Sequence, residues 1–376
     1  AWYALGCALA WQSQSAEDAM LSEAQQCFER VASAQHDLTP HAQLQLGHIF
    51  MRRREPGKAI PLYQSASQTR GIRKEASLSL VKAHLVQNQP DKAADILKSL
   101  DAATRDDQEV HLIYGLVAEI QKDYAKASDE YRSAGAHGPR GVVLYLTGKF
   151  DKAKIELAAA RAEGDHSDRV LYYSGLSHSK LGEHAEAIKE WQELLTRHPD
   201  DTRLELNIAR SWYRLGCEAY RNKDYTKTAE AWERFYKLYS TDEGTRQSLQ
   251  ALYLMIAFQS IGEPAAAKAL NRARQLGAPP EMVRYADGLG AMKNKKWKAA
   301  VDIFLELLKT APQNPVYQYN LGLALLLNQS FSDAEKYLQS AANGSNETLR
   351  NQARWGLAAV AANRGDWANV VALMGN

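Results

Sequence analysis

The sequence contains few cysteines, few prolines and almost no net charge. Three of its 376 residues are cysteines (Cys7, Cys27 and Cys217), and this small, odd number excludes a disulfide framework. The 11 prolines leave long stretches in which helices can form without interruption. The formal net charge is +2, so we expect neither nucleic acid nor an anionic membrane surface as a partner.

Long apolar runs are missing as well. No stretch approaches the roughly 18 consecutive apolar residues that a membrane-spanning helix needs, so we expect no membrane insertion. The hydrophobic fraction of 45% is ordinary for a folded domain. We therefore expect a soluble protein. The sequence leaves its compartment open, because cytoplasmic and periplasmic locations fit equally well.

Motifs for catalysis and for metal binding are absent from the sequence. The 10 histidines are scattered, and no His-Glu-x-x-His, Cys-x-x-Cys or phosphate-loop pattern occurs. The nucleophile motif Gly-x-Ser-x-Gly is absent too. We expect no enzymatic activity, no metal site and no cofactor.

Small residues recur in the sequence at a period of 34. The clearest series are Gly288, Gly322, Gly356 and Ala300, Ala334, Ala368. In most units the later alanine follows the glycine at one fixed spacing, as in Gly175 and Ala187. Two residue types in one register predict a repeated structural unit.

Each unit is expected to be a helical hairpin joined by a short loop. A small residue in the first helix lets a neighbouring helix approach closely, and the alanine on the second helix fills the facing gap. Ordering such a unit costs about 50 kcal/mol, which would require roughly 2,000 Å² of buried apolar surface to offset. An isolated hairpin cannot bury that much, so the units are expected to stack on one another.

This pattern resembles the tetratricopeptide repeat, whose unit has the same length. The stretch Asn320-Leu321-Gly322, followed by Phe331 and Ala334, matches the core of that repeat closely, and Tyr173-Ser174-Gly175 begins a second match. The resemblance covers the whole chain in about eleven units. It implies an all-α fold, a right-handed α-solenoid of stacked antiparallel helix pairs whose concave groove holds a protein or peptide.

The regular spacing breaks at several places. The units that begin near 108 and near 134 follow each other too closely, which indicates a short first helix and a kink near 135–141. This kink would divide the chain into sub-stacks 1–139, of about four repeats, and 140–376, of about seven. An insertion at 13–20 predicts a longer loop or an added turn, Thr202–Arg221 is expected to form one long helix, and 241–244 is expected to be a loop. Alternatively, these irregularities only change the pitch of the stack.

Tyrosines occupy the positions that line the groove in proteins that resemble this one. Tyr172, Tyr213, Tyr285 and Tyr319 stand at position 5 of their units, and Tyr220 stands at position 12. Tyrosine offers a large contact area with little rotamer entropy to lose, which suits an extended peptide. The alternative is that these rings pack between adjacent first helices and line the groove only incidentally.

Basic residues are expected on the same side of two neighbouring units. They are Arg169, Lys180, Arg210, Arg214 and Arg221. Together they predict a positive patch in the middle of the groove that binds carboxylates or an acidic segment. The alternative is a solvated basic face that nearby Glu205 or Glu218 balances.

The sequence thus predicts a scaffold that binds a protein or peptide in its groove. The alternative function is a regulatory or recruiting arm cut from a larger bacterial enzyme or from a polymer or protein export machine. The last helix carries Val370, Val371, Leu373 and Met374. Such an apolar end predicts self-association, a further unit or a partner that covers it.

Overall fold

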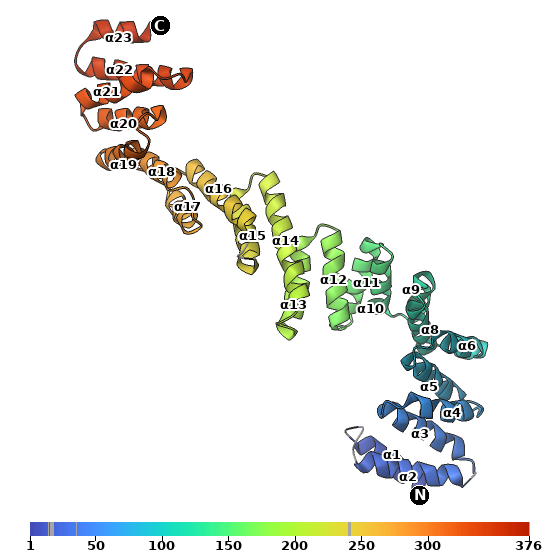
Figure 1. Cartoon of the computed structure of the whole chain (residues 1–376). Helices are drawn as coiled ribbons and strands as arrows, with labels where there is room; N and C mark the ends of the chain where they lie inside the picture. The colour runs from blue at the N-terminus through green and yellow to red at the C-terminus, as the bar shows by residue number, and fades with distance from the viewer. Residues whose placement is uncertain (14, 16–18, 35, 240–241, 376) are drawn as a thin grey trace. The chain divides into compact units, whose positions relative to one another are not determined.

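The computed structural model describes all residues except 14, 16–18, 35, 240–241 and 376. Every regular element within the described residues is a helix, and consecutive helices pack against each other in pairs (Figure 1). The chain divides into two compact units, Ala1–Leu204 and Glu205–Asn376, here called unit 1 and unit 2. The predicted all-α fold of stacked antiparallel helix pairs is confirmed.

Unit 1 consists of six helix pairs with one short additional helix. The pairs are α1 (Trp2–Gln12) with α2 (Ala19–Ser33), α3 (Thr39–Arg52) with α4 (Pro56–Ala66), α5 (Arg73–Val86) with α6 (Pro90–Lys98), α8 (Gln108–Ile120) with α9 (Tyr124–Ser133), α10 (His137–Leu146) with α11 (Phe150–Ala162), and α12 (Asp168–Lys180) with α13 (His184–Arg197). The additional helix, α7 (Ala102–Arg105), lies between the third and fourth pairs.

Unit 2 continues the same pattern. It contains α14 (Thr202–Arg221), which begins at the end of unit 1, followed by α15 (Tyr225–Leu238), α16 (Glu243–Gln259), α17 (Pro264–Gln275), α18 (Pro280–Lys293), α19 (Trp297–Thr310), α20 (Pro315–Leu327), α21 (Phe331–Ala342), α22 (Glu347–Asn363) and α23 (Trp367–Met374).

A glycine in the first helix of most pairs faces a large side chain of the second helix. At Gly288 an added Cβ would lie 2.8 Å from the ring of Phe304, and Gly47 and Gly175 face Tyr63 and Trp191 in the same way. Each of these rings follows its glycine at the same sequence spacing. A Cβ at such a glycine would therefore force the two helices apart, as the spacing of small residues predicts.

The alanines of the repeat lie in the second helix of their pairs. They are fully buried in seven units: Ala59, Ala93, Ala127, Ala153, Ala187, Ala300 and Ala334. Ala368 in α23 is exposed, and the neighbouring side chain of Trp367 is 67% exposed. The predicted covering of this helix by self-association stays a prediction.

Two of the predicted departures from the regular repeat spacing are present in the structure. Helix α10 has only 10 residues, and α14 runs from Thr202 to Arg221 as expected. The insertion at 13–20 lies partly outside the described residues. The predicted sub-stacks 1–139 and 140–376 rest on repeat spacing, and that division stays a prediction.

The predicted loop at 241–244 is wrong in part. Thr241 lies outside the described residues, but Glu243 and Gly244 belong to the first turn of α16. The reason is a helix cap: the carboxylate of Asp242 accepts a hydrogen bond from the backbone N–H of Thr245 at 2.8 Å. This bond satisfies one of the N–H groups that a helix start leaves without a partner.

Candidate partner-binding site

Three of the predicted groove residues lie together on one face of α14. Arg210, Tyr213 and Arg214 stand at helical i, i+3 and i+4 spacing, so their side chains leave the helix on the same side. Ile208 and Ser211 are buried, whereas all three of these side chains are exposed. The amphipathic pattern of α14 therefore presents two guanidinium groups and a phenol to the outside of unit 2.

A row of aromatic rings continues this face onto α15. Trp232 lies nearly parallel to the ring of Tyr213, at a centroid distance of 6.1 Å, and also to the ring of Tyr220, at 6.0 Å. Phe235 contacts Tyr213 at 5.5 Å, and Tyr239 stacks on Phe235 at 5.6 Å. We call these five residues the aromatic row.

The backbone of α14 fixes the central ring of this row. The indole Nε1 of Trp232 donates a hydrogen bond to the carbonyl oxygen of Tyr213 at 3.3 Å. A Cβ at Gly216 would collide with the same ring. Because Gly216 leaves this space free, Trp232 lies close to α14 and aligns the tyrosines beside it.

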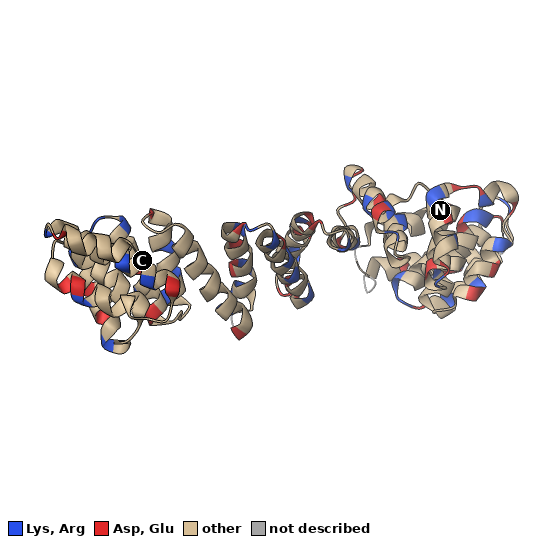
Figure 2. Cartoon of the chain, turned by 90° about the horizontal axis from the view of Figure 1, so that it is seen from above, with Lys and Arg blue, Asp and Glu red and all other residues tan. Residues whose placement is uncertain are grey.

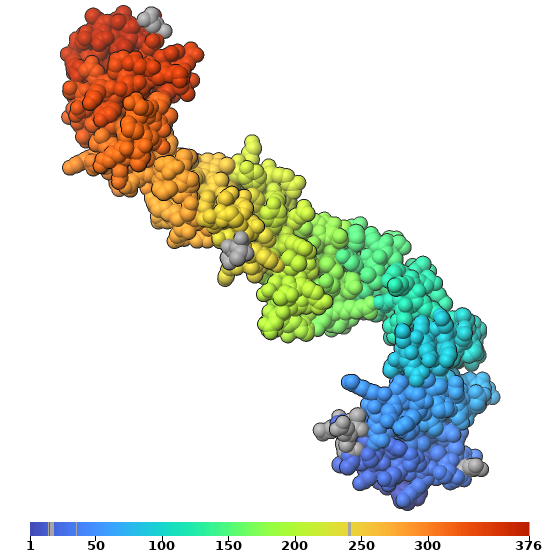
Figure 3. Space-filling view, in the orientation of Figure 1, coloured from blue at the N-terminus to red at the C-terminus, as the bar shows by residue number. Residues whose placement is uncertain are grey.

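A hollow of about 750 Å³ opens between α14, α15 and the start of α16. These helices form the yellow-green and yellow part of the chain in Figures 1 and 3. We call the hollow the α14–α16 hollow. Its lining consists of Leu206, Arg210, Tyr213, Arg214, Trp232, Phe235, Tyr239, Asp242, Gly244, Thr245 and Ser248. Most of the aromatic row thus forms its apolar surface, and Arg210 and Arg214 stand on its α14 wall.

Neither arginine of the hollow is neutralised within the described residues. Arg210 and Arg214 form no ion pair there, and neither Glu205 nor Glu218 pairs with them. Among the described residues of the lining, the single carboxylate belongs to Asp242, whose pKa is lowered by the hydrogen bonds from Thr245. Tyr213 has a raised pKa, caused first by its neighbour Cys217.

Comparison with known families gives three matches along this chain. Models of the tetratricopeptide repeat match residues 50–120, 169–201 and 285–348, in both units. The chain is a tetratricopeptide repeat protein. The helix pairs within these residues are repeats of this family, which is typically a non-catalytic protein-interaction scaffold.

Solved structures of other proteins are similar to the chain at low identity. The C-terminal part of a repeat-containing protein from Cytophaga hutchinsonii is 14% identical, covering 65% of this chain and 98% of that chain, with a TM-score of 0.41. The type IV pilus biogenesis factor PilW is 14% identical, covering 57% of this chain and 100% of that chain, with a TM-score of 0.40. No curated protein sequence matches the chain.

The predicted groove residues of unit 1 lie in a different setting, on the repeat helix α12. Arg169 forms an ion pair with Glu119 of α8, and that carboxylate also accepts a hydrogen bond from the hydroxyl of Tyr131 at 2.8 Å. Tyr172 is half-buried, and Lys180 is exposed at the end of the helix. Arg169 is therefore already neutralised by its own chain.

The predicted tyrosines in the later repeats of unit 2 are partly packed. Tyr285 contacts Phe304, Phe258 and Tyr317, and its hydroxyl accepts a hydrogen bond from Asn320 at 3.4 Å. Burial raises the pKa of Tyr285 and that of the half-buried Tyr319. These two rings stand on α18 and α20, away from the aromatic row, and their role as binding residues stays a prediction.

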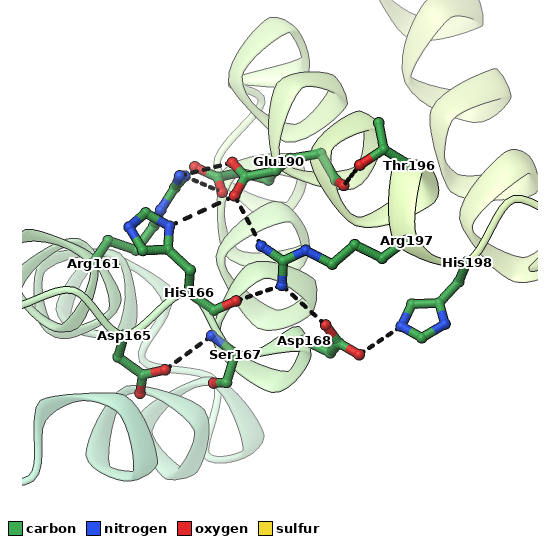
Figure 4. Close-up of polar contacts among 10 residues, drawn as sticks. Arg161, Asp165, His166, Ser167, Asp168, Glu190, Thr196, Arg197 and His198 are labelled. Atoms are coloured by element: carbon green, nitrogen blue, oxygen red, sulfur yellow. Dashed lines mark hydrogen bonds and ion pairs between the residues drawn. The ribbon is translucent and has the colours of Figure 1, made fainter.

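Basic and acidic residues are interspersed over both units of the repeat protein (Figure 2). Most partly buried arginines are paired, as a cluster at the ends of α11 and α13 shows (Figure 4). There Arg161 binds Glu190 and, at 2.8 Å, Glu193, while the carboxylate of Asp168 lies 2.6 Å from His198. The hydrogen bond from His198 lowers the pKa of Asp168.

The described residues contain neither a metal site nor a membrane-spanning helix. Across the described part of the chain, no group of three His, Cys, Asp or Glu side chains is arranged to hold a metal ion. No described helix is long and apolar enough to cross a bilayer.

Proposed function

We propose that the chain is a non-catalytic scaffold that holds an extended, acidic segment of a partner protein. The segment binds in the α14–α16 hollow, with a carboxylate on Arg210 and Arg214 and an apolar side chain on the aromatic row. One observation carries this proposal: two arginines without an ion-pair partner in the described chain border a hollow lined by aromatic rings.

The two arginines are suited to carboxylates by geometry. A guanidinium group offers its N–H donors in a planar fork that binds a carboxylate with two hydrogen bonds. Within the same unit, Arg272 binds Glu233 in this way, with N–O distances of 2.6 and 2.7 Å. Arg210 and Arg214 have the same chemistry but form no ion pair within the described residues, so a partner can supply the carboxylate.

The aromatic row supplies the apolar part of the contact. Its rings are held by one another and by Gly216, so ordering them on binding costs little conformational entropy. Rings next to bound ion pairs also exclude water from them, which strengthens the electrostatic attraction. The backbone N–H and C=O groups of an extended partner segment would remain accessible to water on the side of the hollow that faces solvent.

A second hollow in unit 2 is a weaker candidate although it is larger, at about 880 Å³. It lies among α17, α18, α19 and α20, and its arginines are already neutralised. Arg274 forms an ion pair with Asp287, and Arg284 forms one with Glu306. A charged partner would have to displace these carboxylates first.

Charge reversal at the hollow tests the proposal. A labelled peptide with two glutamates followed by phenylalanine is titrated against the wild type and against Arg210→Glu/Arg214→Glu, with fluorescence anisotropy as the readout. The matched control is Lys237→Glu/Lys268→Glu, which makes the same charge change at two exposed lysines outside the hollow. Circular dichroism verifies that both variants fold.

We expect the Arg210→Glu/Arg214→Glu variant to bind at least about a hundredfold more weakly, because each attraction becomes a repulsion. The control variant is expected to lose much less affinity, through the change in long-range attraction alone. Equal losses in the two variants would show that only net charge matters, and they would remove the hollow as the site.

A further inference from the structure

The α14–α16 hollow carries opposite charges on opposite walls. Arg210 and Arg214 stand on α14, whereas Asp242 stands at the beginning of α16. The apolar rings of Trp232 and Phe235 are part of the lining they share. The hollow is therefore positively charged at the α14 side and negatively charged at the α16 side. A partner segment that is acidic along its whole length does not match this charge distribution.

The charge on Asp242 is available to a partner. No described basic residue forms an ion pair with it, whereas the next residue, Glu243, is paired with Arg246 at 2.6 Å. The hydrogen bonds from Thr245 fix the orientation of the Asp242 carboxylate. A carboxylate has about four acceptor positions, so this cap leaves room for a further donor.

Tyr213 shows that both charges act within the same space. The pKa of its phenol is raised, first by Cys217; among the smaller influences, the charge of Arg214 lowers this pKa and the charge of Asp242 raises it. The ring of Tyr213 belongs to the lining together with both residues. A ligand lying on this ring is thus within electrostatic range of both walls.

We propose that the hollow selects a mixed-charge segment and binds it in one orientation, with carboxylates at Arg210 and Arg214, an apolar side chain on the rings, and a lysine or arginine at Asp242. This inference rests on the proposed function, because it concerns the same site. A uniformly acidic segment would place a carboxylate beside Asp242, and that repulsion rejects it.

A double-mutant cycle between peptide and protein tests this orientation. The probes are labelled peptides with two glutamates, a phenylalanine, zero to three alanines and then a lysine, each paired with the same peptide carrying glutamine in place of lysine. Each pair is titrated by anisotropy against the wild type and against Asp242→Asn. Asparagine is as good a helix cap as aspartate, so this variant removes the charge and keeps the start of α16.

For at least one spacer length, we expect the lysine peptide to bind the wild type about threefold more tightly than its glutamine partner, as for a partly exposed ion pair. Asp242→Asn is expected to abolish this preference and to leave the affinity of the glutamine peptide unchanged or higher. A lysine preference of equal size in both proteins, or no preference at any spacer length, would overturn the inference.

The two proposals fail in distinguishable ways. If the peptides bind the wild type and lose affinity in Arg210→Glu/Arg214→Glu but show no coupling to Asp242, the proposed function holds and the orientation is wrong. If charge reversal at the two arginines leaves binding unchanged, the site itself is wrong. A third variant, Glu263→Gln, removes a carboxylate outside the hollow and should not alter the lysine preference.

Discussion

The indole ring of Trp232 lies against the backbone of Gly216 in the preceding helix. This contact joins α14 to α15, and the rings of Tyr213 and Tyr220 both lie nearly parallel to the indole. The same contact serves the repeat fold and the candidate site, because the spacing that closes a helix pair also fixes the aromatic row.

Replacing Gly216 by alanine is therefore expected to change both stability and binding. The added methyl group collides with Trp232, and overpacking of this kind costs about 1–3 kcal/mol. We expect a lower urea midpoint and weaker binding of the glutamate–phenylalanine peptide. The matched control is Gly290→Ala in α18, where nothing lies within 4 Å of the new methyl group. That variant should be as stable as the wild type or more stable by up to about 1 kcal/mol.

Removing Arg169 and removing Arg214 should have opposite consequences. Arg169 is paired with Glu119, so Arg169→Met leaves a half-buried carboxylate without its partner and should lower the melting temperature. Arg214 has no such partner within the described chain, so Arg214→Met should leave the melting temperature nearly unchanged and weaken peptide binding at least about fivefold. Calorimetric melting and anisotropy titration measure both properties. Weaker binding in the Arg169 variant alone would contradict this assignment.

The ion-pair cluster in unit 1 should contribute to stability through Arg161 (Figure 4). Arg161→Met leaves Glu190, whose side chain is only 12% exposed, without its partner, and we expect a loss of about 1–3 kcal/mol. Adding Glu190→Gln should restore part of this loss, because the uncompensated charge is then removed. The exposed pair of Arg132 and Asp129 is the control, and Arg132→Met should cost less than about 1 kcal/mol. Urea denaturation of the four proteins gives the comparison.

Tyr253 makes a prediction for alkaline pH. Burial, followed by the charge of Glu233, raises its pKa to about 12 in the folded chain, from an ordinary value of 10.0. The contribution of Tyr253 to the free energy of unfolding is fully present below pH 10. It is lost as the pH rises from 10 to 12, because the unfolded chain releases the tyrosine proton first. Tyr253→Phe should thus lose about 1–2 kcal/mol less stability than the wild type over this interval. Parallel unfolding curves at pH 8 and pH 11.5 test this, and equal losses would contradict it.

The repeat architecture could be predicted from the sequence because it depends on local spacing. Gly175 and Ala187 mark one helix crossing, and the same register recurs along the chain. Arg210, Tyr213 and Arg214 could be placed on one face because they share a single helix. Helical periodicity alone is enough to predict both the repeat architecture and the shared face of these three residues.

Contacts between different helices could not be predicted in the same way. Trp232, Phe235 and Tyr239 were missed as binding residues because they lie outside α14: the first two stand on one face of α15 and Tyr239 directly follows that helix. The pairing of Arg169 with Glu119 joins residues 50 positions apart across the shortened repeat. The loop expected at Glu243 and Gly244 was wrong because Asp242 caps a helix that already begins at Glu243.

Site-specific photo-crosslinking tests most directly whether a partner occupies the α14–α16 hollow. The photoreactive residue p-benzoylphenylalanine replaces Tyr239, which lines the hollow, or Met282, which is exposed on α18 outside it. After illumination in native lysate, mass spectrometry identifies the crosslinked peptide. We predict a crosslink at Tyr239 to a segment with carboxylates beside an apolar residue, which is absent at Met282 and disappears with Arg210→Glu/Arg214→Glu. Crosslinks of equal yield at both positions, or crosslinks that persist after charge reversal, would contradict the assignment.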